Sequence, residues 1–229
     1  MELRLLTTPA ERQMFARRLT DMRMMKGAGF SETQRSVIGE VHLAYGNLYG
    51  LFDEALGADQ MIGGFAMHDL AMFSQSYPKP DLTHLPPEAV FECGELWAVA
   101  AGGGRLIRHG GAILARELGA KALLVYPIFK PWNLSGAYPG FIRAGDPIEW
   151  PYARTLDGGK IYVQAMVGGE AAIDGAIAEA GEYGFEVLDT GKRVRFHTPV
   201  GICTKRIGQA RQENRRAALQ PGSGVRKAA

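Results

Sequence analysis

The spacing of polar and apolar residues changes along the first part of the chain, and each spacing predicts a strand or a helix. Alternation from Glu2 to Leu6 predicts a short strand. Thr8, Pro9 and Glu11 then combine an N-cap hydroxyl, a proline at the first helical position and a carboxylate three residues after the cap. This capping box predicts a helix from Pro9 to about Met25. Its apolar residues recur at helical spacing, which predicts core packing for Met14, Phe15, Leu19, Met22 and Met25.

Two further apolar runs predict an antiparallel hairpin. They extend from Asn47 to Asp53 and from Met61 to Leu70, and Gly63-Gly64 in the second run predicts a β-bulge. The segment from Ser74 to Pro87 contains four prolines, too many for regular structure. We expect that segment to form a lid or a wall facing a substrate.

A strand, a glycine-rich turn, a helix and a second strand follow. Val90 to Val99 predicts the first strand, and Ala122 to Tyr126 the second. Between them, glycines up to Gly110-Gly111-Ala112 precede a helix that ends near Leu118-Gly119. Backbone N–H groups and a helix N-terminus attract anions, so the turn predicts a pyrophosphate site. The candidate side chains for contacting phosphate are Arg105, Arg108 and His109. Alternatively, the glycines serve only a flexible turn and close helix packing.

The remaining pattern completes an α/β (α+β) fold. Lys160 to Val167 predicts a strand, and Glu170 to Tyr183 a helix. Phe185 to Leu188 and Val194 to Phe196 predict a closing hairpin. The predicted sheet is mixed and mostly antiparallel.

Composition narrows the class of protein. The chain has 229 residues, 46% hydrophobic and 22% charged, which predicts a single globular domain over residues 1–203. It lacks a long apolar run and a secretory signal pattern, so we expect a cytoplasmic protein without a membrane span. Two cysteines, Cys93 and Cys203, are too few for a disulfide framework or a four-thiolate metal site. The five histidines have no ligand spacing, and no metal is predicted.

The C-terminal segment, residues 204–229, is basic. It has seven Lys and Arg residues and one acidic residue, although the net charge of the whole chain is only +2. Such a tail can bind nucleic acid or an acidic protein. We instead predict a solvated, partly disordered end, since the segment runs into Pro221-Gly222-Ser223-Gly224. A nucleic-acid-binding function is not predicted.

Two nucleotide-binding motifs are absent. The glycine-rich turn is not a G-x-G-x-x-G followed by an acidic residue about 20 positions later, and no G-x-x-x-x-G-K-[ST] occurs. Antiparallel strands also precede the predicted β–α–β unit, whereas a Rossmann sheet normally begins with that unit. The sequence therefore favours neither a Rossmann nor a P-loop protein.

The order of these elements resembles the GCN5-related N-acyltransferase (GNAT) superfamily. Arg108-His109-Gly110-Gly111-Ala112 is similar to the R-x-x-G-x-G/A turn of that family, which holds the pyrophosphate of coenzyme A or the phosphopantetheine arm of an acyl carrier protein. The family's arginine position falls on Ile107, and Arg105 or Arg108 is expected to replace it. The resemblance implies a GNAT-like twisted sheet with helices on both faces, and an acyl-CoA or acyl-phosphopantetheine donor.

A narrower resemblance is to the autoinducer-synthase and long-chain N-acyl amino acid synthase branch. Phe91 to Val99 is similar to its acidic central strand, and Pro139 to Glu149 resembles a later helix, an arginine-glycine turn and an apolar strand. The acidic and aromatic N-terminal signature of that branch is not recognisable between Arg12 and Asp53. The branch implies an amino acid-like amine acceptor and an acyl carrier protein as a further partner.

Acyl transfer needs a base, because the attacking amine must lose a proton. The candidates are Glu92 and Glu95, which are three apart on a strand and so point to opposite faces. We predict Glu95. A backbone N–H near Ala98 or Val99 is expected to hold the oxyanion. The resemblance also implies a tyrosine on a following helix that protonates the leaving thiolate, and Tyr138 lies near that position.

The predicted function is transfer of an acyl group from a thioester to a small-molecule amine. Five aromatic residues could line an acyl pocket, although simple core packing is the commoner role: Phe65, Phe73, Trp97, Phe129 and Trp132. Two other classes stay open. One is a small-molecule N-acetyltransferase acting on an amine, an amino sugar or an antibiotic, and the other is a non-catalytic ligand-binding protein with the same fold.

Overall fold

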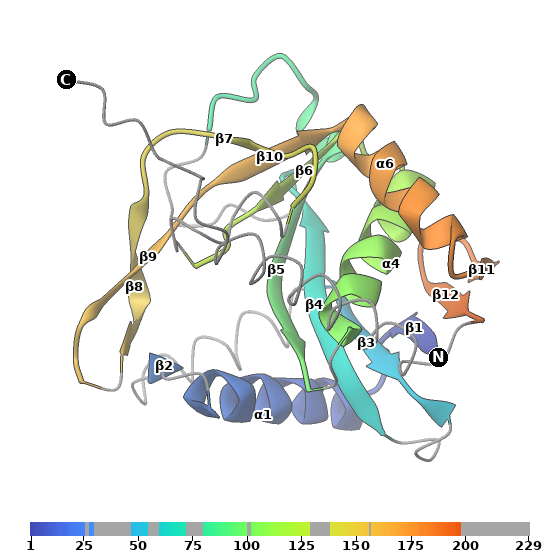
Figure 1. Cartoon of the computed structure of the whole chain (residues 1–229), viewed down its shortest axis with the longest axis horizontal. Helices are drawn as coiled ribbons and strands as arrows, with labels where there is room; N and C mark the ends of the chain where they lie inside the picture. The colour runs from blue at the N-terminus through green and yellow to red at the C-terminus, as the bar shows by residue number, and fades with distance from the viewer. Residues whose placement is uncertain are drawn as a thin grey trace, which may run out of the picture.

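A nine-stranded sheet forms the centre of the described structure (Figure 1). The computed structural model describes residues 1–25, 28–29, 47–54, 60–71, 80–99, 102–128, 138–155 and 157–197. The strand order is β11-β12-β1-β3-β4-β5-β6-β10-β7. In chain order, these strands are β1 (Glu2–Leu5), β3 (Asn47–Phe52), β4 (Met61–Asp69), β5 (Val90–Ala98), β6 (Ala122–Val125), β7 (Ile142–Arg143), β10 (Met166–Gly169), β11 (Phe185–Asp189) and β12 (Arg193–Phe196).

All neighbouring strands of this sheet are antiparallel except β5 and β6. The mixed, mostly antiparallel sheet predicted from the sequence is therefore confirmed. The hairpin of β3 and β4 and the closing hairpin of β11 and β12 are also confirmed. A parallel pair needs a long crossover, and here the helix α4 (Gly103–Glu117) supplies it.

Helices cover both faces of the sheet, as predicted. On one face, α4 and α6 (Glu170–Gly181) pack against β-strand side chains in a core that includes Phe65, Ile107 and Ile173. On the other face, α1 (Pro9–Met25) contributes Phe15 and Leu19 to a second core. We call these the α4 face and the α1 face. Side chains alternate between the two faces along each strand, so the sheet contributes to a hydrophobic core on each face.

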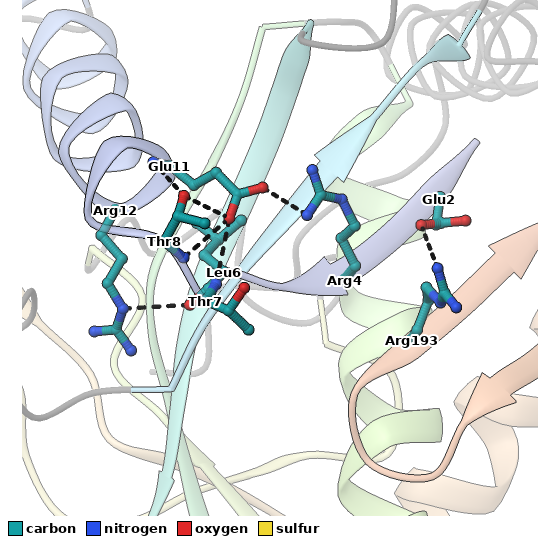
Figure 2. A network of polar contacts seen from close by, with 8 residues as sticks. All are labelled: Glu2, Arg4, Leu6, Thr7, Thr8, Glu11, Arg12 and Arg193. Carbon is teal, nitrogen blue, oxygen red and sulfur yellow. Dashed lines mark hydrogen bonds and ion pairs between the residues drawn. The ribbon is translucent and has the colours of Figure 1, made fainter.

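The start of α1 is fixed by the predicted capping box (Figure 2). The backbone N–H of Glu11 donates to Thr8 Oγ1 at 3.2 Å, and that of Thr8 donates to Glu11 Oε2 at 3.2 Å. Two orphan N–H groups are thereby satisfied. Arg4 in β1 forms an ion pair with the same carboxylate at 2.6 Å, so the cap also ties the helix to the sheet.

A second sheet of three strands packs beside the α1 face. Its strands are β2 (Ala28–Gly29), β8 (Ile148–Thr155) and β9 (Lys160–Val163). The sequence predicted one strand from Lys160 to Val167, but the structure splits it into β9 and β10. Gln164 lies between the two strands, where its N–H donates to the carbonyl of Pro127 and its Nε2 donates to that of Gly145.

Some predictions fall on residues outside the described ranges. They include residues 74–79 of the proline-rich segment and the basic tail. The described end of the proline-rich segment leads through a 3₁₀ turn (η3, Pro87–Ala89) into β5. Within the described part of the chain, no helix is long and apolar enough to span a membrane. Nor do three or more His, Cys, Asp or Glu side chains gather there as metal ligands would.

Candidate functional site

The glycine-rich turn lies earlier than the sequence predicted. Gly102 caps α4 with a left-handed φ of 88°, and the helix begins at Gly103. Glycine readily adopts a left-handed backbone conformation, which explains glycine at position 102. Residues 108–112 are therefore helix interior and not the anion-binding turn, which corrects the prediction for that segment.

Gly110 and Gly111 serve packing instead. A Cβ on Gly110 would lie 2.3 Å from Leu3 Cδ2, and one on Gly111 would lie 3.4 Å from Phe65. Ala112 is buried in the same core. The alternative of close helix packing is thus the correct one for these three residues, because α4 approaches β1 and β4 at this point.

Arg105 and His109 face α6 and not the turn. Both contact Glu179, with Arg105 Nη2 at 2.9 Å and His109 Nε2 at 3.2 Å from the same Oε2. The hydrogen bond from Arg105 is the main cause of the lowered pKa of Glu179. Burial lowers the pKa of His109, which favours its neutral form. These side chains join two helices, and phosphate contact by Arg105 or His109 stays a prediction.

Arg108 lies one turn from Arg105 on α4, and its guanidinium has no ion pair among the described residues. The charge lies 5.8 Å from the centre of the Tyr138 ring. A Cβ on Gly104 would be 3.9 Å from Arg108 Nη1, so the guanidinium reaches the first turn of the helix. Burial lowers its pKa, because desolvation disfavours the charge. The N-terminus of α4 and Arg108 together form an electropositive site suited to a phosphate.

Next to this site, β5 and β6 separate. They pair only from Val90 with Ala122 to Cys93 with Val125. Farther along β5, Val99 N–H donates to the carbonyl of Ile62 in β4 at 2.9 Å. Since N–H groups alternate in direction along an antiparallel strand, that of Ala98 points to the edge that β6 has left. Ala98 therefore keeps its predicted role as a possible oxyanion donor, whereas the N–H of Val99 is already used.

The two candidate bases are placed differently by a bulge in β5. Glu95 has a φ of 53°, the only positive value of a non-glycine residue in the described ranges, and is half-buried. The pairing of β4 with β5 shifts at this point, where Glu95 and Leu96 together oppose Phe65. A bulge is therefore present next to Gly64, as predicted, but the extra residue belongs to β5 and not to β4.

Glu92 is only 1% exposed, and it lies directly opposite His68 of β4, which is 4% exposed. Glu92 also contributes to the raised pKa of Tyr126, after the larger effect of burial. The structure therefore brings a carboxylate, an imidazole and a phenol together on the α1 face. Sequence reasoning missed His68, and only the register of β4 against β5 could have revealed it.

Tyr138 belongs to a turn before β7 and not to a helix, which corrects that prediction. Its ring packs against Phe141 at 5.6 Å, and both lie beside Cys93 of β5. Burial raises the pKa of Tyr138, so its hydroxyl holds its proton at neutral pH. Burial likewise raises the pKa of the Cys93 thiol, to about 12. Cys93 is therefore an uncharged thiol that packs beside Tyr138 and Phe141.

The two described aromatic residues of the predicted acyl pocket lie on opposite faces of the sheet. Trp97 belongs to the core of the α1 face and meets Phe15 edge to face at 5.8 Å. Phe65 belongs to the α4 face and stacks on Tyr49 at 5.1 Å. The two cannot line one pocket because the sheet lies between them. Phe73, Phe129 and Trp132 lie outside the described residues.

This arrangement of sheet, bulge and crossover helix is the GNAT fold. Solved structures confirm it: a protein described as an N-acetyltransferase from Lactobacillus plantarum superposes with a TM-score of 0.51 at 14% identity, over 73% of this chain and 96% of that one. A protein described as a phosphinothricin N-acetyltransferase gives 0.50 at 14% identity, over 74% and 98%. FeeM, an N-acyl amino acid synthase from uncultured soil microbes, gives 0.49 at 13% identity, over 72% and 90%. The sequence itself matches no protein-family model and no curated protein.

Proposed function

We propose that this protein is an N-acyltransferase that moves an acyl group from a phosphopantetheine thioester to the amine of a small molecule. The observation that carries the proposal is the separation of β5 from β6 beside the glycine N-terminus of α4. The electropositive end of α4 and Arg108 would hold the donor's pyrophosphate or phosphate. The pantetheine arm would then lie along the open edge of β5, with its thioester carbonyl near the N–H of Ala98.

In this mechanism, the amine nitrogen attacks the thioester carbonyl carbon and its proton passes to a carboxylate. Glu92 and Glu95 are the candidates, and we now favour Glu92, because it lies beside the strand separation with His68 opposite. The N–H of Ala98 would stabilise the oxyanion. Collapse of the intermediate breaks the C–S bond, and the departing thiolate takes the proton of the Tyr138 hydroxyl, which solvent then replaces.

The two faces of the sheet would bind different substrates. Arg108 and Tyr138 lie with α4, whereas Glu92 and His68 lie on the α1 face. A donor entering from the α4 side and an acceptor entering from the α1 side would meet where the strands part. The donor is acyl-CoA or an acyl carrier protein, and the acceptor is amino acid-like in our proposal.

Thiol release tests the proposal. Acetyl-, octanoyl- and palmitoyl-coenzyme A, and the matching acyl carrier proteins, would each be incubated with pooled amino acids and amines. We expect acceptor-dependent release that falls at least about tenfold in Glu92→Gln, since loss of a general base typically costs that much or more. A smaller loss is expected for Glu95→Gln, which serves as the matched control.

Three outcomes would change the assignment. A larger loss of thiol release in Glu95→Gln than in Glu92→Gln would identify Glu95, in the bulge, as the general base. Preference for the acetyl donor would favour a small-molecule N-acetyltransferase. A folded protein that binds coenzyme A but releases no thiol would be a ligand-binding protein with this fold.

A further inference from the structure

A row of three polar side chains crosses the centre of the sheet on the α1 face. The strands β4, β5 and β6 lie side by side there (Figure 1). His68 of β4 lies directly opposite Glu92 of β5. On the other side, Glu92 pairs with Leu124 of β6, and Tyr126, two residues farther along that chain, points to the same face. Glu92 is therefore flanked by an imidazole and a phenol.

The placement of these groups indicates that they interact. Directly opposed residues of antiparallel strands have Cβ atoms about 4.5–5.5 Å apart. Glu92 contributes to the raised pKa of Tyr126, after the larger effect of burial, so the carboxylate lies close to the phenol. The next ionisable group on β5, the Cys93 thiol, packs on the α4 face. The elements packed against the α1 face supply apolar side chains: Phe15 and Leu19 from α1, and Trp150, Ile161 and Val163 from β8 and β9.

Burial makes an ionised Glu92 costly. Glu92 is only 1% exposed, and His68 is 4% exposed. Desolvation disfavours the charged form of a carboxyl group, whereas hydrogen bonds donated to the carboxylate favour it. A general base must be ionised before it can accept a proton. The polar neighbours of Glu92 therefore decide whether it can act as a base at neutral pH.

Glu179 shows what a cationic neighbour does to a carboxylate. Arg105 donates to it at 2.9 Å and is the main cause of its lowered pKa. A carboxylate stabilised in this way is a weaker base. An imidazole and a phenol can each donate a hydrogen bond without a permanent charge. His68 and Tyr126 can thus support an ionised Glu92 and leave more of its basicity.

The row lies where β5 and β6 separate. Cys93 and Val125 are the last residues of the two strands to pair. Glu92 comes one residue before Cys93, and Tyr126 one residue after Val125. The carboxylate is therefore beside the place where the proposed thioester would lie. A base at this depth can take the proton of the amine directly or through one bound water.

We propose that His68 and Tyr126 are positioning residues, which donate hydrogen bonds to the Glu92 carboxylate and hold it ionised and oriented towards the strand separation. Their roles rest on the proposed acyltransferase function, with Glu92 as the base. Neither residue gains or loses a proton during the reaction, because the proton of the amine passes to Glu92. Both therefore affect acyl transfer only through that carboxylate.

The pH dependence of kcat tests these roles. Transfer would be followed across the range in which carboxyl and imidazole groups titrate, with the most active thioester and amine. Removing a donor leaves the effect of burial less opposed. The acid limb, where kcat declines as pH falls, should therefore move to higher pH by about one unit or more in His68→Leu and Tyr126→Phe. The KM for the thioester should change less than about twofold.

Two further variants control for structural effects. His68→Gln retains an N–H donor and should move the acid limb by less than about half a unit. Tyr49→Phe removes another buried hydroxyl, which donates to the carbonyl of Gly191 at 2.7 Å on the α4 face. It should lower the melting temperature and leave the acid limb in place. If His68→Leu does not fold, Tyr126→Phe carries the test.

A double-mutant cycle separates positioning from a general effect on the fold. In the Glu92→Gln background, His68→Leu and Tyr126→Phe should each lower kcat by less than about a further twofold, since no carboxylate remains for them to act on. Equal fractional losses of kcat with and without Glu92 would overturn the positioning roles.

The remaining outcomes distinguish the two proposals. A folded wild type that transfers nothing from any donor overturns the acyltransferase function and these roles together. Transfer that is insensitive to Glu92→Gln leaves the function standing, but it overturns Glu92 as the base and the roles of its neighbours. Dependence on Glu92 with an unchanged acid limb in His68→Leu and Tyr126→Phe overturns the positioning roles alone.

Discussion

Arg105 and Arg108 are three residues apart on one helix, yet their surroundings differ. Arg105 is neutralised by Glu179 of α6 at 2.9 Å, whereas Arg108 is half-buried against Tyr138. A desolvated cation that forms no ion pair, as Arg108 is among the described residues, gains stability when an anion binds to it. At the residue scale, this contrast favours Arg108 over Arg105 as a phosphate contact.

Substitution of the two arginines should separate their roles. Arg108→Gln is expected to raise the KM for a coenzyme A thioester about tenfold, because a charge-assisted hydrogen bond to phosphate is lost. Arg105→Gln should mainly lower the melting temperature, since it breaks a contact between helices. Steady-state kinetics and thermal unfolding of both variants would check this. Equal effects on KM would argue against Arg108 as the phosphate ligand.

At the element scale, α4 shows how packing overrides local preference. Glycine in a helix interior costs about 1 kcal/mol relative to alanine, so five glycines from Gly102 to Gly111 predict a loop. The structure nevertheless continues the helix through Gly110, because that position lies against Leu3 of β1 and Phe196 of β12. Neither contact can be read from spacing along the helix.

Alanine at the two helix glycines tests this explanation. Gly110→Ala should destabilise the fold by about 1–3 kcal/mol through overpacking against Leu3. Gly111→Ala should be close to neutral, because its Cβ would lie 3.4 Å from Phe65 and alanine favours a helix. Denaturant unfolding measures both changes. An increase in donor KM for Gly110→Ala at unchanged stability would instead support the phosphate role predicted from the sequence.

The N-terminus of α1 is the element for which sequence reasoning was most complete. Thr8 and Glu11 alone predicted the cap, and both hydrogen bonds are present (Figure 2). Thr8→Ala should cost about 1 kcal/mol of unfolding free energy. Thermal or urea unfolding would detect it, with Thr7→Ala as a neighbouring control. No loss in Thr8→Ala would mean that the ion pair of Arg4 with Glu11 suffices.

At the scale of the whole molecule, the contact between α4 and α6 should make stability depend on pH. The folded pKa of His109 is lowered chiefly by burial, so the unfolded chain binds this proton more readily than the native protein does. The contribution of His109 is therefore complete above its unfolded pKa of about 6.5 and declines as pH falls below that value. Glu179, whose pKa is lowered chiefly by Arg105, adds a further loss at more acidic pH.

Unfolding at several pH values would measure this effect. Wild-type stability should decrease between pH 7 and pH 5, by at most about 1.4 kcal/mol per pH unit from this histidine. His109→Gln should weaken that dependence, because glutamine does not titrate. The same slope in both proteins would assign the pH dependence to other groups.

The sequence by itself determined the elements whose signals are local. The cap of α1, the hairpin of β3 and β4, and the β5–α4–β6 crossover follow from turn residues and from apolar periods within a few residues. These features, with the order of elements, were enough to predict the GNAT fold. They were also enough to name Glu92, Ala98 and Arg108 among the site candidates.

Only the tertiary structure decided how those candidates are arranged. The bulge at Glu95 changes which β5 side chains share a face, and the register of β4 places His68 opposite Glu92. Leu3 of β1 and Phe196 of β12, which are far apart in the sequence, leave no room for a side chain on Gly110. The physical reason is common to all three: strand register and packing depend on contacts between distant segments, and local periodicity carries no information about them.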